Sequence, residues 1–234
     1  MEQSEDSVVA IRLKFEERLK TVYDPEELKS LFFYALEALC GMRKTDYILR
    51  QKQDLNPIEL THFEELISRL EKEEPIQYIL GITEFYGRQF DVDPNVLIPR
   101  PETEMLVEWT LDNLPAQERL RIADLGTGCG AIAIALAYER PAWTIDAIDN
   151  SKKALNVAKR NADWHRTSNV NFYCGEWCQA LPAKKYRAIL GNPPYIASAD
   201  AHLQNLSYEP QAALNGGGDG LQAIEIIIKE AQHY

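Results

Sequence analysis

The sequence predicts an α/β protein in which a doubly wound parallel sheet follows a small helical bundle. Helix-type apolar spacing dominates the first 80 residues, whereas short apolar runs alternate with helical runs from residue 101 onward. We therefore expect a helical domain over residues 1–80, a β-hairpin linker over residues 81–100 and an α/β domain over residues 101–234.

Three apolar stripes define the expected bundle. They comprise Val8, Ile11, Phe15, Leu19 and Val22; Leu28, Phe32, Ala35 and Leu39; and Leu60, Phe63, Ile67 and Leu70. Asp24-Pro25 and Asn56-Pro57 each place a capping side chain before a first-turn proline, and a glutamate follows at the third helical position. These signals predict two helix starts and a small bundle core.

The linker is expected to be a hairpin over Thr83–Ile98 with its turn at Asp93-Pro94-Asn95. Beyond it the predicted order is helix 103–114, strand 121–125, helix 131–138, strand 143–148, helix 151–165, strand 170–174, strand 186–190 and helix 221–233. A ligand should lie at the carboxyl ends of the first and fourth strands of this order, where the winding of the sheet reverses.

A glycine loop, Asp124-Leu125-Gly126-Thr127-Gly128-Cys129-Gly130, follows the first of these strands directly and opens the next helix. Such a loop lets a ligand approach the backbone, and the helix start offers free N–H groups. Asp149 ends the next strand, 19 residues after Gly130. Its carboxylate is placed to accept hydrogen bonds from both hydroxyls of a ribose.

A second motif, Asn192-Pro193-Pro194-Tyr195, follows the fourth strand. It could be a stiff turn, but beside the glycine loop it suggests methyl transfer to a planar nitrogen. The Asn192 side chain and the Pro193 carbonyl can accept two N–H groups, and Tyr195 offers a flat wall. Holding both N–H groups aims the poorly nucleophilic nitrogen at an electrophilic carbon.

From about Glu73 to Leu221 the chain resembles the release factor glutamine methyltransferases, the HemK-type enzymes. The resemblance rests on the two motifs above and on three further segments: Leu97-Ile98-Pro99-Arg100-Pro101-Glu102-Thr103-Glu104, Tyr208-Glu209-Pro210 and Gly217-Gly218-Asp219-Gly220-Leu221. It implies a Rossmann-like methyltransferase domain, with the helical domain recognising the substrate. The implied donor is S-adenosylmethionine, with S-adenosylhomocysteine as product. The implied acceptor is the glutamine in the Gly-Gly-Gln loop of bacterial class-I peptide chain release factors.

The resemblance also implies roles for individual residues, all of which precede Pro210. The implied catalytic residues are Asn192, Pro193 and Tyr195. The implied cofactor-binding residues are Gly126, Thr127, Gly128, Cys129, Gly130, Asp149, Trp177 and Asn192. The implied substrate-binding residues are Asn192, Pro193, Pro194 and Tyr195.

Two features depart from the family pattern. Glu176 stands before Trp177 where the family usually has aspartate, which puts the contact with the adenine amine in doubt. Relatives also continue past the helix that ends here near Tyr234, and the continuation forms the last strands of their sheet. The resemblance therefore predicts a sheet that lacks its C-terminal strands, so that strand 186–190 has an unpaired edge and an uncovered apolar face.

Composition narrows the class of protein. The net charge is −11, which does not suggest direct binding to nucleic acid, and no segment resembles a signal peptide or a membrane span. Cys40, Cys129, Cys174 and Cys178 form no C-x-x-C pair, and we expect no metal site. We expect a cytoplasmic protein.

Three other functions remain open at this stage. The Asn-Pro-Pro-Tyr motif also occurs in adenine-N6 DNA methyltransferases, which need a basic cleft for DNA. The glycine loop satisfies the loose pattern of nicotinamide-dependent oxidoreductases, a function that leaves Asn192 without a role. The chain could also be a truncated fragment that binds cofactor without catalysis.

Overall fold

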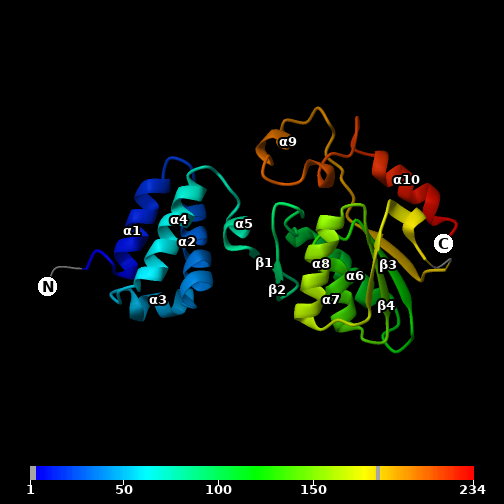
Figure 1. Cartoon of the computed structure of the whole chain (residues 1–234), viewed down its shortest axis with the longest axis horizontal. Helices are drawn as coiled ribbons and strands as arrows, with labels where there is room; N and C mark the ends of the chain where they lie inside the picture. The colour runs from blue at the N-terminus through cyan, green and yellow to red at the C-terminus, as the bar shows by residue number, and fades with distance from the viewer. Residues whose placement is uncertain (1–3, 183–184) are drawn as a thin grey trace. The chain divides into compact units, whose positions relative to one another are not determined.

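A computed structural model describes residues 4–182 and 185–234 (Figure 1). Residues 1–3 of the expected helical domain and residues 183–184 of the expected α/β domain lie outside the described residues. Internal contacts divide the chain into two compact units, Met1–Leu80 and Gly81–Tyr234. The hairpin segment belongs to the second unit.

The first unit is helical. Its helices are α1 (Val8–Leu19), α2 (Pro25–Cys40), α3 (Lys44–Arg50), α4 (Pro57–Leu70) and α5 (Ile76–Leu80). α2 begins where predicted because the Asp24 carboxylate accepts two first-turn N–H groups at 2.9 Å. α4 begins with a capping box, in which Asn56 accepts two N–H groups and Glu59 accepts the Asn56 N–H at 2.8 Å.

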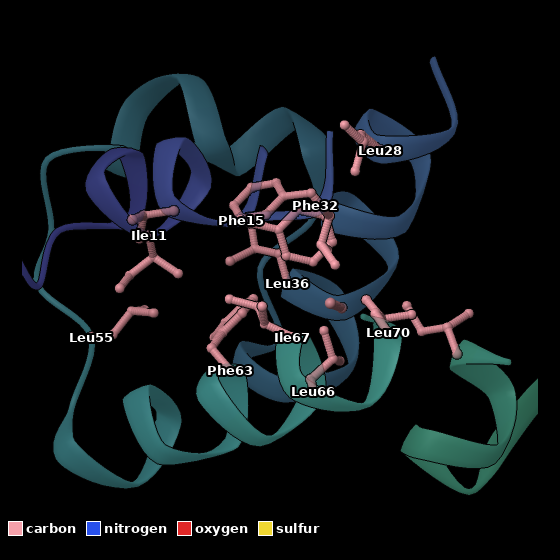
Figure 2. Packing of buried hydrophobic residues seen from close by; sticks show 14 of the residues in the cluster. Ile11, Phe15, Leu28, Phe32, Leu36, Leu55, Phe63, Leu66, Ile67 and Leu70 are labelled. Atoms are coloured by element: carbon pink, nitrogen blue, oxygen red, sulfur yellow. The ribbon is translucent and has the colours of Figure 1, made fainter. Parts of the chain in front are cut away.

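The core of this unit is aromatic at its centre. Figure 2 shows Phe15, Phe32 and Phe63 converging from α1, α2 and α4. Phe15 and Phe32 meet edge to face with their centroids 5.6 Å apart. Full burial of each such side chain stabilises the fold by roughly 1.5–3 kcal/mol.

Most residues of the three predicted apolar stripes are buried in the core, but the prediction was not correct for every residue. Leu36 and Leu66 are buried, whereas Leu39 and Leu60 are only partly buried. Val22 lies beyond the end of α1 and is also only partly buried. An α-helix has 3.6 residues per turn, so a stripe assigned by fixed steps of three and four residues matches the buried face only over about two turns.

The second unit begins with a hairpin whose predicted turn was wrong. β1 (Ile82–Phe85) pairs antiparallel with β2 (Arg88–Asp91), and the two-residue turn is Tyr86-Gly87. Both turn residues have positive φ, 51° and 66°, as the tight turn that matches strand twist requires. The Asp93-Pro94-Asn95 turn follows β2 instead of joining the strands.

A four-stranded parallel sheet forms the centre of this unit, as predicted. Its strands are β3 (Arg121–Leu125), β4 (Thr144–Asp149), β5 (Val170–Cys174) and β6 (Ala188–Gly191), in the order β5-β4-β3-β6. Leu125 is in register with Ile148 on one side and Gly191 on the other. The residues that follow these three strands therefore meet at one edge of the sheet.

Helices cover both faces of the sheet. α6 (Glu104–Asn113), α7 (Ala131–Glu139) and α8 (Lys152–His165) pack together on one face, and α10 (Gln222–Ala231) lies on the other with the 3₁₀ turn η2 (Trp177–Ala180) (Figure 1). Short turns complete the unit: η1 (Pro101–Thr103), α9 (His202–Asn205) and η3 (Gln211–Ala213). No helix in the described part of the chain is long and apolar enough to span a bilayer.

The predicted strand 186–190 differs from β6 at both ends. Tyr186 precedes the strand; its hydroxyl donates to Asp146 at 2.7 Å, and its N–H donates to the carbonyl of Tyr234 at 2.9 Å. Within the described residues β6 pairs with β3 alone. The expected uncovered apolar face was wrong, because Ile227, Ala231 and Tyr234 pack with Ile189 in one apolar cluster.

Candidate active site

The glycine loop turns sharply at the end of β3. Gly126, Gly128 and Gly130 all have positive φ, 72°, 56° and 87°. The N–H groups of Gly126 and Thr127 both donate to the carbonyl of Ile148 at 2.9 Å, which anchors the loop to the neighbouring strand. The loop backbone therefore faces the space beyond the strand ends.

Asp149 braces this loop from the end of β4. One carboxylate oxygen accepts the Gly128 N–H at 2.9 Å, and the other accepts the Ser151 N–H at 2.8 Å. Each oxygen keeps a further lone pair, so the carboxylate can also accept two ligand hydroxyls. Burial raises the pKa of Asp149, and the two N–H bonds oppose that rise.

Trp177 packs against the glycine loop at Gly126. Its φ is +41°, which is unusual for a bulky side chain, and such strain persists where the surrounding structure enforces it. A Cβ built on Gly126 would lie 3.5 Å from the Trp177 ring, so the ring lies directly over the loop. Glu176 lines the same space.

These groups surround a cavity of about 180 Å³. Of the predicted cofactor residues, Gly126, Gly128, Asp149, Trp177 and Asn192 line it. Its other lining residues are Asn95, Val96, Leu97, Ile148, Asn150, Ser151, Ala154, Gly175, Glu176, Pro194, Pro210, Ala212 and Ala213. The lining thus also includes Pro210, Ala212 and Ala213, which lie at or beyond the last of the quoted Tyr-Glu-Pro residues.

Thr127, Cys129 and Gly130, predicted as cofactor residues, do not line the cavity. The Thr127 hydroxyl donates to the buried Asp124 carboxylate at 2.6 Å. Gly130 permits close helix packing, because a Cβ there would lie 2.8 Å from Ile134 and 3.2 Å from Ala158. Burial raises the pKa of the Cys129 thiol to about 12, so this cysteine stays uncharged.

Asn161, on α8, fixes the other side of the loop. Its fully buried side chain donates to the carbonyls of Cys129 and Asp91, at 2.9 and 3.0 Å, and accepts the Asp91 N–H at 2.7 Å. One amide thereby joins the glycine loop to strand β2. Sequence reasoning missed this residue, which carries no motif of its own.

The Asn-Pro-Pro-Tyr segment leaves β6 beside the cavity. Asn192 lines the 180 Å³ cavity and also a neighbouring cavity of about 350 Å³. The second cavity is bounded by Arg100, Glu102, Thr103, Leu106, Gly191, Asn192 and Tyr195. The Asn192 side-chain N–H donates to the Thr103 hydroxyl at 3.3 Å. The Tyr195 side chain is exposed, and Pro193 lines a third, smaller hollow that also reaches Asn192.

Two later glycines, Gly216 just before the Gly-Gly-Asp-Gly motif and Gly220 within it, support this segment. A Cβ on Gly216 would lie 2.7 Å from the Pro194 carbonyl oxygen, and a Cβ on Gly220 would overlap that of Tyr195. The backbone bonds Ile196 N–H to Leu214 O and Gly216 N–H to Ile196 O, at 3.0 and 2.8 Å, complete the contact. The glycines thus allow two backbones to lie against one another.

Glu209 joins the linker motif to the same region. Its buried side chain forms an ion pair with Arg100 and accepts the Ile98 N–H at 3.1 Å. The segments quoted for the family resemblance therefore lie around one site within the second unit. Among the described residues, no cluster of His, Cys, Asp or Glu is arranged to hold a metal ion.

Comparisons with known proteins agree with this geometry. Residues 103–233 match the family model described as Methyltransferase small domain, and residues 11–81 match PrmC N-terminal domain. A release factor glutamine methyltransferase of Coxiella burnetii is 55% identical over 199 residues, covering 85% of this chain and 72% of the relative. This chain belongs to the release factor glutamine methyltransferase family.

Other members of the family match over similar spans. The Xylella fastidiosa enzyme is 44% identical, covering 74% of this chain and 63% of its own length. The Flavobacterium psychrophilum enzyme is 39% identical, covering 87% of this chain and 73% of its own length. The catalytic domain of hMettl16, solved with an RNA hairpin, shares the fold with a TM-score of 0.50 at 19% identity, over 76% of this chain and 63% of that one.

Family membership confirms the predicted fold, a Rossmann-like methyltransferase domain behind a helical N-terminal domain, and S-adenosylmethionine as cofactor. The cavity fits that cofactor in its chemistry. Asp149 offers acceptors for ribose hydroxyls, and Trp177 offers an aromatic face.

Proposed function

We propose that this chain methylates the side-chain amide nitrogen of the glutamine in the Gly-Gly-Gln loop of class-I peptide chain release factors. The observation that carries the proposal is the position of Asn192, which lines both the cofactor cavity and the adjoining second cavity. A group that enters the second cavity can therefore meet the cofactor at this side chain.

The acceptors around Asn192 suit a primary amide. The Asn192 side-chain oxygen accepts one N–H of the glutamine and the Pro193 carbonyl accepts the other, while the exposed Tyr195 ring offers a flat surface for the planar group. These contacts leave the amide nitrogen as the atom free to react. When bound, S-adenosylmethionine supplies an electrophilic methyl group.

The remaining residues hold the cofactor and the loop. Gly126, Gly128, Asp149 and Trp177 would contact the cofactor, and Thr127, Cys129 and Gly130 shape the turn that presents the glycine backbone. Catalysis then depends on positioning, since a correctly oriented pair of reactants reacts far faster than the same pair free in solution.

The first unit is proposed to recognise the body of the release factor. Support comes from its match to the N-terminal domain of the family and from exposed apolar side chains on α3, where Ile48 and Leu49 are 71% and 88% exposed. A translation factor as substrate also implies action in the cytoplasm.

The experiment supplies radiolabelled S-adenosylmethionine to the protein with a release factor, with the same factor carrying alanine for the Gly-Gly-Gln glutamine, or with duplex DNA. We expect label in the unchanged release factor alone. Label in adenine would support the DNA methyltransferase alternative. Cofactor binding without label in any substrate would support a non-catalytic fragment.

A further inference from the structure

Thr103 stands at the start of α6, where a threonine normally caps the helix. Its side chain makes no capping hydrogen bond, and its backbone is already helical, with φ −70° and ψ −20°. The hydroxyl instead accepts the Asn192 side-chain N–H at 3.3 Å, across 89 residues of sequence. Threonine at this position usually caps its own helix, but Thr103 instead contacts Asn192, the proposed catalytic residue.

This contact holds the Asn192 amide by its NH₂ end. The amide has an acceptor oxygen and a donor NH₂ group, and a half-turn of the side chain exchanges them. With the NH₂ group held by Thr103, the oxygen remains available to accept an N–H from the substrate. In the opposite orientation the Thr103 hydroxyl could still donate to the amide oxygen, but the NH₂ group would then face the N–H of the substrate, one donor against another.

We infer that Thr103 is a positioning residue that orients the Asn192 amide for the acceptor glutamine, an inference that rests on the proposed function. Thr103 and Asn192 both line the second cavity, so the contact lies beside the space where the substrate would enter. Thr103 does not line the cofactor cavity. Its effect should therefore fall on turnover and leave cofactor affinity unchanged.

The test compares Thr103→Val, which keeps the shape but removes the hydroxyl, with Thr103→Ser, which keeps the hydroxyl. Thr110→Val is the matched control, because the Thr110 hydroxyl lies on the same helix and donates only to the Leu106 carbonyl, at 2.7 Å. Thr103→Ala serves as a second variant should valine impair folding. Steady-state methylation of a release factor, cofactor calorimetry and a thermal melt are measured for each.

We expect Thr103→Val to lower kcat about tenfold with KM and the cofactor Kd within about twofold of wild type. Thr103→Ser and Thr110→Val should stay within about twofold in kcat. In an Asn192→Ala background, Thr103→Val should cause no further loss, because no amide remains to orient.

Three results would overturn the inference: an unchanged kcat in Thr103→Val, an equal loss in the Asn192→Ala background, or a parallel loss of cofactor affinity. Failure of the proposed function would look different. The wild-type protein itself would then leave the release factor unlabelled.

Discussion

Arg100 and Glu209 lie 109 residues apart in the sequence and form an ion pair in which the Glu209 side chain is only 3% exposed. Glu209 also accepts the Ile98 N–H, so one carboxylate fixes the linker against the segment that leads into η3. Both segments contribute to the cofactor cavity, through Leu97 and Ala213. This one contact therefore contributes both to the stability of the fold and to the geometry of the site.

Glu209→Gln should lower the free energy of unfolding by about 1–3 kcal/mol, because it leaves the Arg100 charge without its partner. Arg100 is 32% exposed, so the loss should be smaller than for a fully buried pair. Urea unfolding measures it. Glu26→Gln is the control, since Glu26 pairs with Lys29 but is 85% exposed, and a change above about 0.5 kcal/mol there would contradict the argument from burial.

Asp149→Ala should weaken S-adenosylmethionine binding by ~1.5–3 kcal/mol, the usual magnitude for hydrogen bonds to a charged group. Part of that loss would come from the Gly128 N–H, which loses its acceptor. Calorimetry gives the dissociation constant. Asp163→Asn, an exposed acid on α8, should leave that constant unchanged; equal constants for wild type and Asp149→Ala would remove Asp149 from the site.

Asn192→Ala should lower kcat about 10²-fold, the magnitude typical of removing a preorganised hydrogen-bonding group from an active site. The side chain is only partly buried and lies in a loop, so the melting temperature should change little. Steady-state kinetics and a thermal melt check both statements. Activity within threefold of wild type would exclude the proposed role.

Asp124→Asn should change how stability depends on pH. Burial raises the pKa of Asp124 from 3.8 to about 6, despite the opposing hydrogen bond from Thr127. Between about pH 4 and pH 6, the Asp124 carboxyl is therefore protonated in the folded protein but ionised in the unfolded chain. The stability that this group contributes is present below about pH 4 and is lost as the pH rises to about 6.

The asparagine variant has no proton to lose at this position. Relative to wild type, it should gain up to roughly 3 kcal/mol between pH 4 and pH 7, as a shift of about two pKa units implies. Urea unfolding of both proteins at several pH values gives this difference, in which the other carboxylates cancel. A difference that is constant with pH would show that Asp124 titrates normally.

Gly220→Ala should destabilise the protein by about 1–3 kcal/mol and reduce turnover. Gly220 has φ +81°, and an added Cβ would overlap the Tyr195 carbonyl oxygen. Gly218→Ala is the control, because its Cβ would meet open space. Equal melting temperatures for the two variants would show that the segment after Tyr195 can move to accept the methyl group.

The sequence predicted this site well where a motif follows a strand. Leu125, Ile148 and Gly191 are in register at the carboxyl ends of neighbouring parallel strands, and this register brings the next residues, Gly126, Asp149 and Asn192, together. The glycine loop and the Asn-Pro-Pro-Tyr motif can each be recognised from neighbouring residues alone, so the sequence identifies the segments that follow β3 and β6.

Contacts between distant segments could not be predicted in the same way. The Thr103–Asn192 hydrogen bond and the buried bonds of Asn161 depend on how loops and helices pack, and no local pattern encodes that packing. The hairpin was misplaced because Asp93-Pro94-Asn95 is a strong turn signal, whereas Tyr86 adopts positive φ without one.

The bonds of Asn161 make the backbone amide of Asp91 a natural probe of the cofactor loop. This N–H donates to the buried side chain that also holds the carbonyl of Cys129, so it exchanges with solvent only when that junction opens. Deuterium uptake at a single amide in the hairpin thus reports how often the glycine loop loosens, without any label placed in the site itself.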